Sequence, residues 1–161
     1  MDDAALLAAL PKSLAGQESV YSSWCRSSGA DLASHVHDLA KAAEADCADD
    51  VARGATGPTT VEEIEAALHS VPLDTAVELM TNLSADSLVF PGHARRDRAH
   101  AMRAAMKAAS ILGPGAQWFS NIDGSWGNGR SWEPVTRHTF DGVVAGRGGG
   151  FLLALLQVGE D

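Results

Sequence analysis

Cysteine is scarce in this sequence. The chain has 161 residues and only two cysteines, Cys25 and Cys47. Two cysteines are too few for the network of disulfides that holds small secreted domains together. Cys47 also falls on the apolar stripe of a predicted helix, so we expect free, partly buried thiols. The N-terminus begins Met-Asp-Asp and lacks the basic start of a signal peptide. These features predict a cytoplasmic protein.

Long apolar runs and basic residues are also scarce. No run approaches the roughly 18 apolar residues of a membrane-spanning helix. The chain has 12 Lys and Arg residues against 21 Asp and Glu residues, which gives a formal net charge of −9. Nucleic acids and anionic membranes bind to basic surfaces, so this composition argues against both as partners. It is compatible with a basic protein partner, although acidic residues also serve solubility alone.

The sequence lacks a motif that identifies a reaction. His35 and His37 are two apart on a predicted helix and therefore point to nearly opposite sides. The glycine-rich stretch 146–150 is not followed by the Lys-Ser/Thr pair of a phosphate-binding loop. Residues 123–127 resemble a nucleophile elbow but have aspartate in place of the first glycine. We therefore expect no metal site and no cofactor, while a dyad of Cys25 with a histidine distant in sequence stays open.

The first two thirds of the chain have the apolar periodicity of helices. Thr60 and Glu63 form a capping-box pattern, and Ala99, Met102, Met106 and Ala109 lie on one stripe. The predicted helices are 3–10, ended by Pro11, then 17–27, 31–53 behind an Asp31 cap, 60–71, 74–83 behind an Asp74 cap, and 93–112. The apolar run 88–90 is interpreted as a short edge strand.

The last third of the chain has the β signals. Residues 117–122, 139–145 and 151–158 are the predicted strands, and the last two flank a glycine-rich turn as an antiparallel hairpin. The apolar run 151–156 is typical of a strand buried on both faces. Helices followed by antiparallel strands predict an α+β fold in a single domain 1–161. About five or six helices, mainly in 1–113, would pack on a small, mainly antiparallel sheet of three to four strands in 114–161.

A loop rich in glycine and tryptophan, residues 123–137, separates the first of these strands from the hairpin. Trp and Arg are enriched at binding hot spots, and long loops in compact domains are often functional. Both tryptophans of this loop can equally fold back onto the sheet. The candidate partner-binding residues are Trp126, Asn128, Arg130, Trp132 and Glu133 in the loop, and Asp46, Asp49 and Asp50 at the end of predicted helix 31–53.

Three functions remain after these exclusions, one of which is a structural subunit that offers the apolar strand 151–156 to a partner. The first is a small protein-binding module, such as an inhibitor or immunity-type protein that neutralises a partner by binding it. A small acidic α+β chain without a reaction motif is similar in general style to bacterial immunity proteins. The alternative is a small enzyme or small-molecule-binding protein with its site under loop 123–137. There His138 would act as a general base beside Asp123, Glu133 or Asp141. The oligomeric state stays open.

Overall fold

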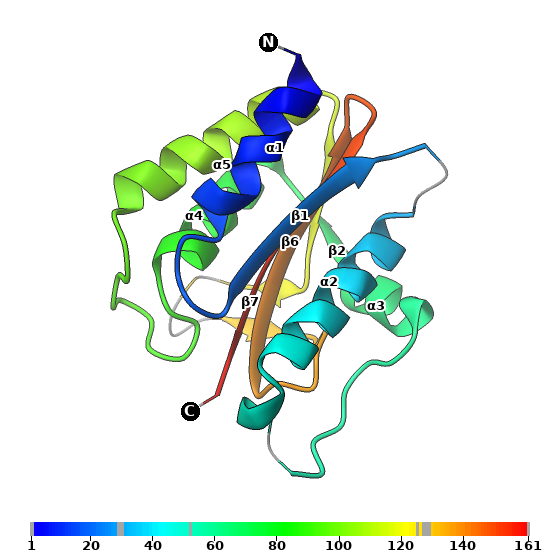
Figure 1. Ribbon diagram of the computed structural model, residues 1–161, viewed down its shortest axis with the longest axis vertical. Helices are drawn as coiled ribbons and strands as arrows, with labels where there is room; N and C mark the ends of the chain where they lie inside the picture. Colours follow the sequence, from blue (N-terminus) through cyan, green and yellow to red (C-terminus); the bar gives the residue numbers. More distant parts are fainter. Residues whose placement is uncertain (1, 29–30, 52, 125, 127–129, 161) are drawn as a thin grey trace.

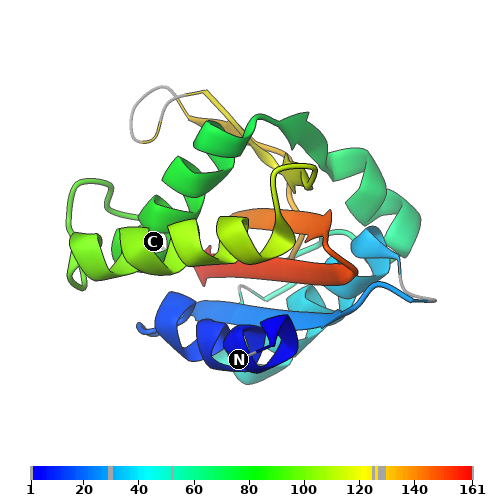
Figure 2. The same ribbon diagram turned by 90° about the horizontal axis from the view of Figure 1, so that it is seen from above.

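The computed structural model describes residues 2–28, 31–51, 53–124, 126 and 130–160. It is an α+β structure in which helices cover both faces of an antiparallel sheet (Figures 1 and 2). In chain order the elements are α1 (Asp3–Leu14), β1 (Val20–Arg26), α2 (Leu32–Asp46), the 3-10 helix η1 (Ala48–Asp50), α3 (Val61–Ala67), β2 (His69–Val71), α4 (Leu73–Ala85), α5 (Arg98–Leu112), β3 (Gln117–Ser120), β4 (Ile122–Asp123), β5 (Ser131–Trp132), β6 (Phe140–Gly148) and β7 (Phe151–Gly159). The described residues form five α-helices, so the predicted fold class is confirmed.

The main sheet has five strands in the order β1-β7-β6-β3-β2, and every neighbouring pair is antiparallel. It is larger than the predicted sheet because β1 and β2 come from the helical part of the sequence. The predicted hairpin of β6 and β7 is confirmed, with Val144 opposite Leu155. A separate pair, β4 and β5, lies in the region of the tryptophan loop.

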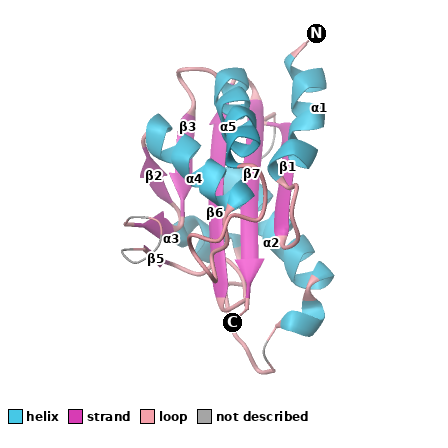
Figure 3. Ribbon diagram, turned by 90° about the vertical axis from the view of Figure 1, so that its left-hand side faces the viewer, coloured by secondary structure: helices cyan, strands magenta, loops and turns pink. Residues whose placement is uncertain are grey.

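Two apolar clusters fill the space between the sheet and its helices. α1, α4 and α5 lie on one face and α2 and α3 on the other (Figure 1). α4 contacts both β6 and β7, and this helix layer is seen from its outer side in Figure 3. β7 is buried on both faces, since Leu153 and Leu155 belong to the first cluster and Leu152 and Leu156 to the second. The prediction of a doubly covered last strand is therefore confirmed.

The prediction of a helix over 17–27 is wrong, because residues 20–26 form β1. Val20 and Trp24, the two residues that suggested a helical face, lie four apart, and this spacing fits one face of a helix or of a strand equally. The residue that follows each of them decides the period: Val20 and Trp24 belong to the first apolar cluster, whereas Tyr21 and Cys25 pack on the second. β1 pairs with β7 along its whole length, so tertiary pairing determines its conformation.

Several predicted helix boundaries need correction. Pro11 does not end α1, which continues to Leu14 because Leu10 and Leu14 are buried in the core. α5 begins at Arg98 rather than at residue 93. The Asp97 side chain caps this start by accepting from the backbone N–H of Ala99 at 3.0 Å. The predicted helix 31–53 ends at Asp46, and the helix predicted to begin at Asp74 begins one residue earlier, behind Pro72. The Asp31 and Thr60 caps are confirmed.

Residues 88–90 do not form the expected edge strand. The backbone N–H of Leu88 donates instead to the side-chain Oε1 of Gln157, at 2.7 Å. The same side chain donates to the carbonyl oxygens of Leu83 and Asp86, at 2.8 and 2.9 Å. A buried glutamine on β7 therefore satisfies backbone groups that a neighbouring strand would otherwise bind.

The methionine stripe of α5 is not its buried face. Small side chains face the core instead, namely Ala101, Ala104, Ala105 and Ala108. Met102 and Met106 are 43% and 57% exposed. The alanine face allows α5 to pack closely against α1 and α4 and leaves both methionines at the surface.

A close contact between Trp118 of β3 and Gly146 of β6 fixes the spacing on one face of the sheet. The two residues are directly paired, and a Cβ atom on Gly146 would lie 2.6 Å from the Trp118 ring. Trp118 is 3% exposed, so its ring has little room to move. We expect Gly146→Ala to lower the free energy of unfolding by about 1–3 kcal/mol, measured by urea denaturation.

The matched control is Gly115→Ala, because a Cβ there meets nothing within 4 Å. Equal stability of the two variants would contradict this account of the Trp118 contact.

Candidate functional site

The two tryptophans of loop 123–137 pack on the core rather than standing free. Both are partly buried against the apolar cluster beneath α1, α4 and α5. The Trp126 Nε1–H group donates to Asp86 Oδ2 at 2.7 Å. The Trp132 ring stacks on Phe140 with centroids 5.5 Å apart. These contacts correspond to the second interpretation of the loop, in which it covers the sheet.

Arg130 joins the two rings. Its guanidinium carbon lies 5.1 Å from the Trp126 centroid and 5.3 Å from that of Trp132. Its Nη2 donates to the carbonyl oxygen of Leu88 at 2.6 Å, and burial lowers the pKa of Arg130 from its ordinary value. Glu133 is exposed, and Asn128 lies outside the described residues. A partner-binding role for these residues stays a prediction.

The four residues of the alternative acid–base site form no hydrogen bond or ion pair with one another among the described residues. Asp123 pairs with His69 on β2, at 3.2 Å. Asp141 is buried and accepts from the side chain of Asn121 and from the backbone N–H groups of Val135 and Thr136. Glu133 is exposed. Among the described residues, His138 forms no hydrogen bond with any of the other three.

Asp141 fixes the end of the loop to the start of β6. Thr136 adds a second donor, its hydroxyl, at 2.8 Å. Burial raises the pKa of Asp141 to about 6, against the opposing effect of the donors from Thr136, Val135 and Asn121. The contacts of this carboxylate account for the path of the chain into β6.

His138 pairs with a residue that the sequence analysis did not select. Its Nδ1 lies 3.1 Å from Oε1 of Glu160, which also accepts from the Thr139 backbone N–H at 3.0 Å, while the second Glu160 oxygen accepts from the Thr139 hydroxyl. Burial opposes ionisation of Glu160, but the hydrogen bonds from Thr139 and the contact with His138 outweigh it and lower the Glu160 pKa. The two residues are 22 positions apart, so no local pattern could have paired them.

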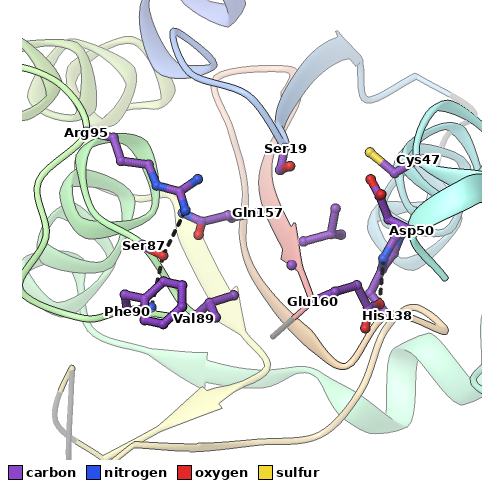
Figure 4. A pocket seen from close by; sticks show the side chains of 12 residues that line it. Ser19, Cys47, Asp50, Ser87, Val89, Phe90, Arg95, His138, Gln157 and Glu160 are labelled. Carbon is purple, nitrogen blue, oxygen red and sulfur yellow. Dashed lines mark hydrogen bonds and ion pairs between the residues drawn. The ribbon is translucent and has the colours of Figure 1, made fainter. Parts of the chain in front are cut away.

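A cleft of about 240 Å³ opens beside this pair (Figure 4). Ser87, Phe90 and Arg95 of the α4–α5 connection lie on one side in this view, and Cys47 and Asp50 on the other. The end of β7 lies between them, together with Ser19 and Gln157. The lining is mainly polar, but Phe90 is 58% exposed.

Asp86 and Gln157 hold the first wall of the cleft in place. Gln157 binds the backbone of residues 83–88 through the three contacts described above. Asp86 accepts from the backbone N–H groups of Ser87 and Gly92, at 2.8 and 3.1 Å, as well as from Trp126. The tryptophan loop therefore supports the connection that forms the cleft wall.

The predicted acidic residues lie on the opposite side. Asp46, Asp49 and Asp50 are all exposed at the end of α2 and in η1. Asp46 accepts from the Tyr21 hydroxyl at 2.5 Å, and Asp50 lines the cleft. Within the described residues, none of the three forms an ion pair with a basic side chain.

A cysteine–histidine contact does exist elsewhere, on the face of β1 toward α2. Cys25 Sγ lies 3.5 Å from His35 Nδ1, while His35 Nε2 lies 3.1 Å from the Ser23 carbonyl oxygen. Burial, and then the charge of Asp38, raise the pKa of the Cys25 thiol. A raised pKa keeps this thiol protonated, which disfavours a nucleophilic role.

Neither a metal centre nor a membrane span is found in the described part of the chain. No group of three or more histidine, cysteine, aspartate or glutamate side chains there is arranged to hold a metal ion. None of its helices has the length and apolar character needed to span a bilayer. Comparison of the chain with models of protein families, with curated proteins and with solved structures gave no match.

Removing the Asp141 carboxylate should destabilise the fold. Asp141→Ala leaves the backbone N–H groups of Val135 and Thr136 and the amide of Asn121 without their acceptor. We expect a loss of about 2–4 kcal/mol in the free energy of unfolding at pH 7, measured by urea denaturation. Asp123→Ala is the control, since that side chain is 70% exposed and a surface ion pair contributes less than about 1 kcal/mol.

The contribution of Asp141 should also depend on pH. Its pKa is raised from 3.8 to about 6, so the folded protein binds the proton more tightly than the unfolded chain. The stability gained from protonation is complete below pH 3.8 and is lost as the pH rises through 6. The difference in stability between wild type and Asp141→Ala should therefore fall by about 3 kcal/mol across this interval. A constant or rising difference would contradict the assignment.

Proposed function

We propose that this chain is a protein-binding module that captures a basic segment of a partner protein at the cleft between η1 and the α4–α5 connection. Its binding would neutralise the partner, as an inhibitor or immunity-type protein does. The observation that carries the proposal is the pair of exposed carboxylates of Asp49 and Asp50 beside a polar cleft, neither of which has an ion-pair partner among the described residues. Free Cys25 and Cys47 support a cytoplasmic location for this activity.

The chemistry of the two walls fits a peptide segment with a basic side chain. Asp50 lines one side and the adjacent Asp49 adds a second exposed carboxylate, while the net charge of −9 attracts a basic partner over longer range. Phe90, exposed on the other side, offers apolar area to the stem of a lysine or arginine. Arg95 on the same wall can donate to the carbonyl oxygens of the segment.

The test is affinity purification from the native host with wild type and the variant Asp49→Lys/Asp50→Lys. Reversing both charges should weaken partner binding at least about tenfold, because like charges then face a basic segment. Asp46 stays unchanged, since it accepts from the Tyr21 hydroxyl.

A matched control keeps the net charge equal. Glu62→Lys/Glu65→Lys reverses two exposed carboxylates on α3, which do not line the cleft. A partner retained by this control and lost by the η1 variant supports the proposal. If both variants retain the partner, or if both lose it, the η1 carboxylates are not part of the interface.

A second candidate function is the binding of a small anionic molecule in the same cleft. The specific observation is that Arg95, Ser19 and the His138–Glu160 pair all border a cavity of about 240 Å³. Nε2 of His138 is buried and has no hydrogen-bond partner among the described residues. This alternative retains His138 from the predicted acid–base site and replaces its expected neighbours by Glu160 and Arg95.

Small carboxylates and phosphates test this second candidate. A ligand of this site should raise the melting temperature of wild type and leave that of Arg95→Ala unchanged. The variant loses the 3.3 Å hydrogen bond from the Arg95 side chain to Ser87 Oγ but keeps the one that the Arg95 backbone N–H donates to the Ala85 carbonyl oxygen at 2.7 Å. Equal shifts in both proteins, or none in wild type, would exclude an anion site at Arg95.

A further inference from the structure

An apolar groove runs between α4 and α5, on surface that shares no residue with the cleft. Leu73 and Val77 line it from α4, and Met102, Met106 and Ala109 line it from α5. Leu73, Met102 and Met106 are 46%, 43% and 57% exposed. They are three of the four large apolar side chains exposed in the described part of the chain, and Phe90 is the fourth.

The two helices that form the groove are antiparallel. Asn82, near the end of α4, accepts from Arg98 at the start of α5. Leu73, at the start of α4, borders the groove together with Pro114 beyond the end of α5. Val77 lines the same stretches of the groove as Met106, so these two residues stand at about the same level along it.

The two edges of the groove carry opposite charges. Asp74 and Glu78 are exposed on α4, and Arg103 and Lys107 are exposed on α5. Val77 and Met106 stand at one level along the groove, and a helix rises about 1.5 Å per residue. Asp74 therefore stands within about 3 Å of the level of Lys107, and Glu78 stands within about 3 Å of the level of Arg103. None of these four side chains forms an ion pair among the residues that the structure describes.

We propose that the groove binds a second copy of this chain, with the two-fold axis along the groove. That axis brings α4 of one copy over α5 of the other, so the acidic edge of each faces the basic edge of its partner. Rotation about an axis along the groove leaves the position of every residue along the groove unchanged. The acidic residues of one copy therefore face the basic residues that stand at the same level in the other copy. A two-fold axis across the groove would instead bring acidic edge onto acidic edge and basic onto basic, which is repulsive.

The apolar and charged groups then have complementary roles. Met102 and Met106 of both copies form the centre of the interface, where flexible thioether side chains fill irregular space well. Asp74, Glu78, Arg103 and Lys107 form its rim and select the relative orientation of the two copies. The resulting contact is a bundle of four helices, two from each chain.

Sedimentation equilibrium of the full chain over a range of concentrations tests the proposal. Wild type should associate to twice the 16.8 kDa mass of one chain. Met102→Lys/Met106→Lys should stay monomeric and folded, since both side chains are at the surface. Phe90→Lys is the matched control, because it changes an equally exposed apolar residue outside the groove, and it should dimerise as wild type does.

A charge exchange tests the orientation. Glu78→Lys and Arg103→Glu should each weaken dimerisation at least about tenfold, because each homodimer then pairs like charges. Mixing the two variants should restore a heterodimer, since the lysine introduced on α4 of one chain would face the glutamate introduced on α5 of the other.

Three results would overturn the proposal. The first is a wild type that remains monomeric up to about 0.5 mM, a concentration at which a dimer with a dissociation constant of about 1 mM would be detectable. The second is a dimer that persists in Met102→Lys/Met106→Lys. The third is a mixture of the two charge variants that does not associate. None of these results bears on the partner cleft, so failure here and failure of the proposed function are distinguishable.

Discussion

The burial of β7 on both faces is the constraint on which the rest of the structure depends. The strand lies between β1 and β6, and its side chains alternate between the two apolar clusters. Each cluster needs a helix layer to exclude water, so one strand requires α1, α4 and α5 on one side and α2 and α3 on the other. Gln157 is the single polar side chain of β7, and its buried amide must find partners.

The partners of Gln157 connect the core to the surface. It binds backbone groups of residues 83–88, and this segment continues into the wall of the cleft. Asp86 extends the same connection to Trp126. The position of the cleft therefore follows from one polar residue in an otherwise apolar strand, together with a carboxylate that accepts from two backbone groups and an indole.

Local signals in the sequence predicted those parts of the fold that local interactions determine. The β6–β7 hairpin has a glycine-rich turn between apolar runs, and the Thr60 cap has its acceptor and donor three residues apart. β1 was mistaken for a helix because its conformation depends on pairing with a strand more than a hundred residues away. The face of α5 was misassigned because a stripe of alanines buries less apolar area than a stripe of methionines, although alanine permits closer packing.

The candidate site was the least predictable part, for the same reason. His138 was selected from the sequence, but Glu160 was not, and the contact of Gln157 with Leu88 spans 69 positions. Residue type leaves two roles open: Trp126, Arg130 and Trp132 are the types that form hot spots, and they are equally suited to cover a core by stacking. Charge alone places only some of the acidic residues at the end of α2: Asp46, Asp49 and Asp50 are exposed, whereas Glu44 is buried and pairs with Arg137.

The side chains of Asn121 and Asp141 form a clamp at the base of the tryptophan loop. Asn121 donates to Asp141 at 2.8 Å and accepts from the backbone N–H of Val143 at the same distance. The clamp brings the two ends of the segment 122–140 together, and its carboxylate also holds Val135 and Thr136 within that segment. The entropy of closing such a loop grows only slowly with its length. Changes of length in this segment are therefore compatible with the sheet only where they leave the clamp and the packing of Trp126 and Trp132 on the core in place.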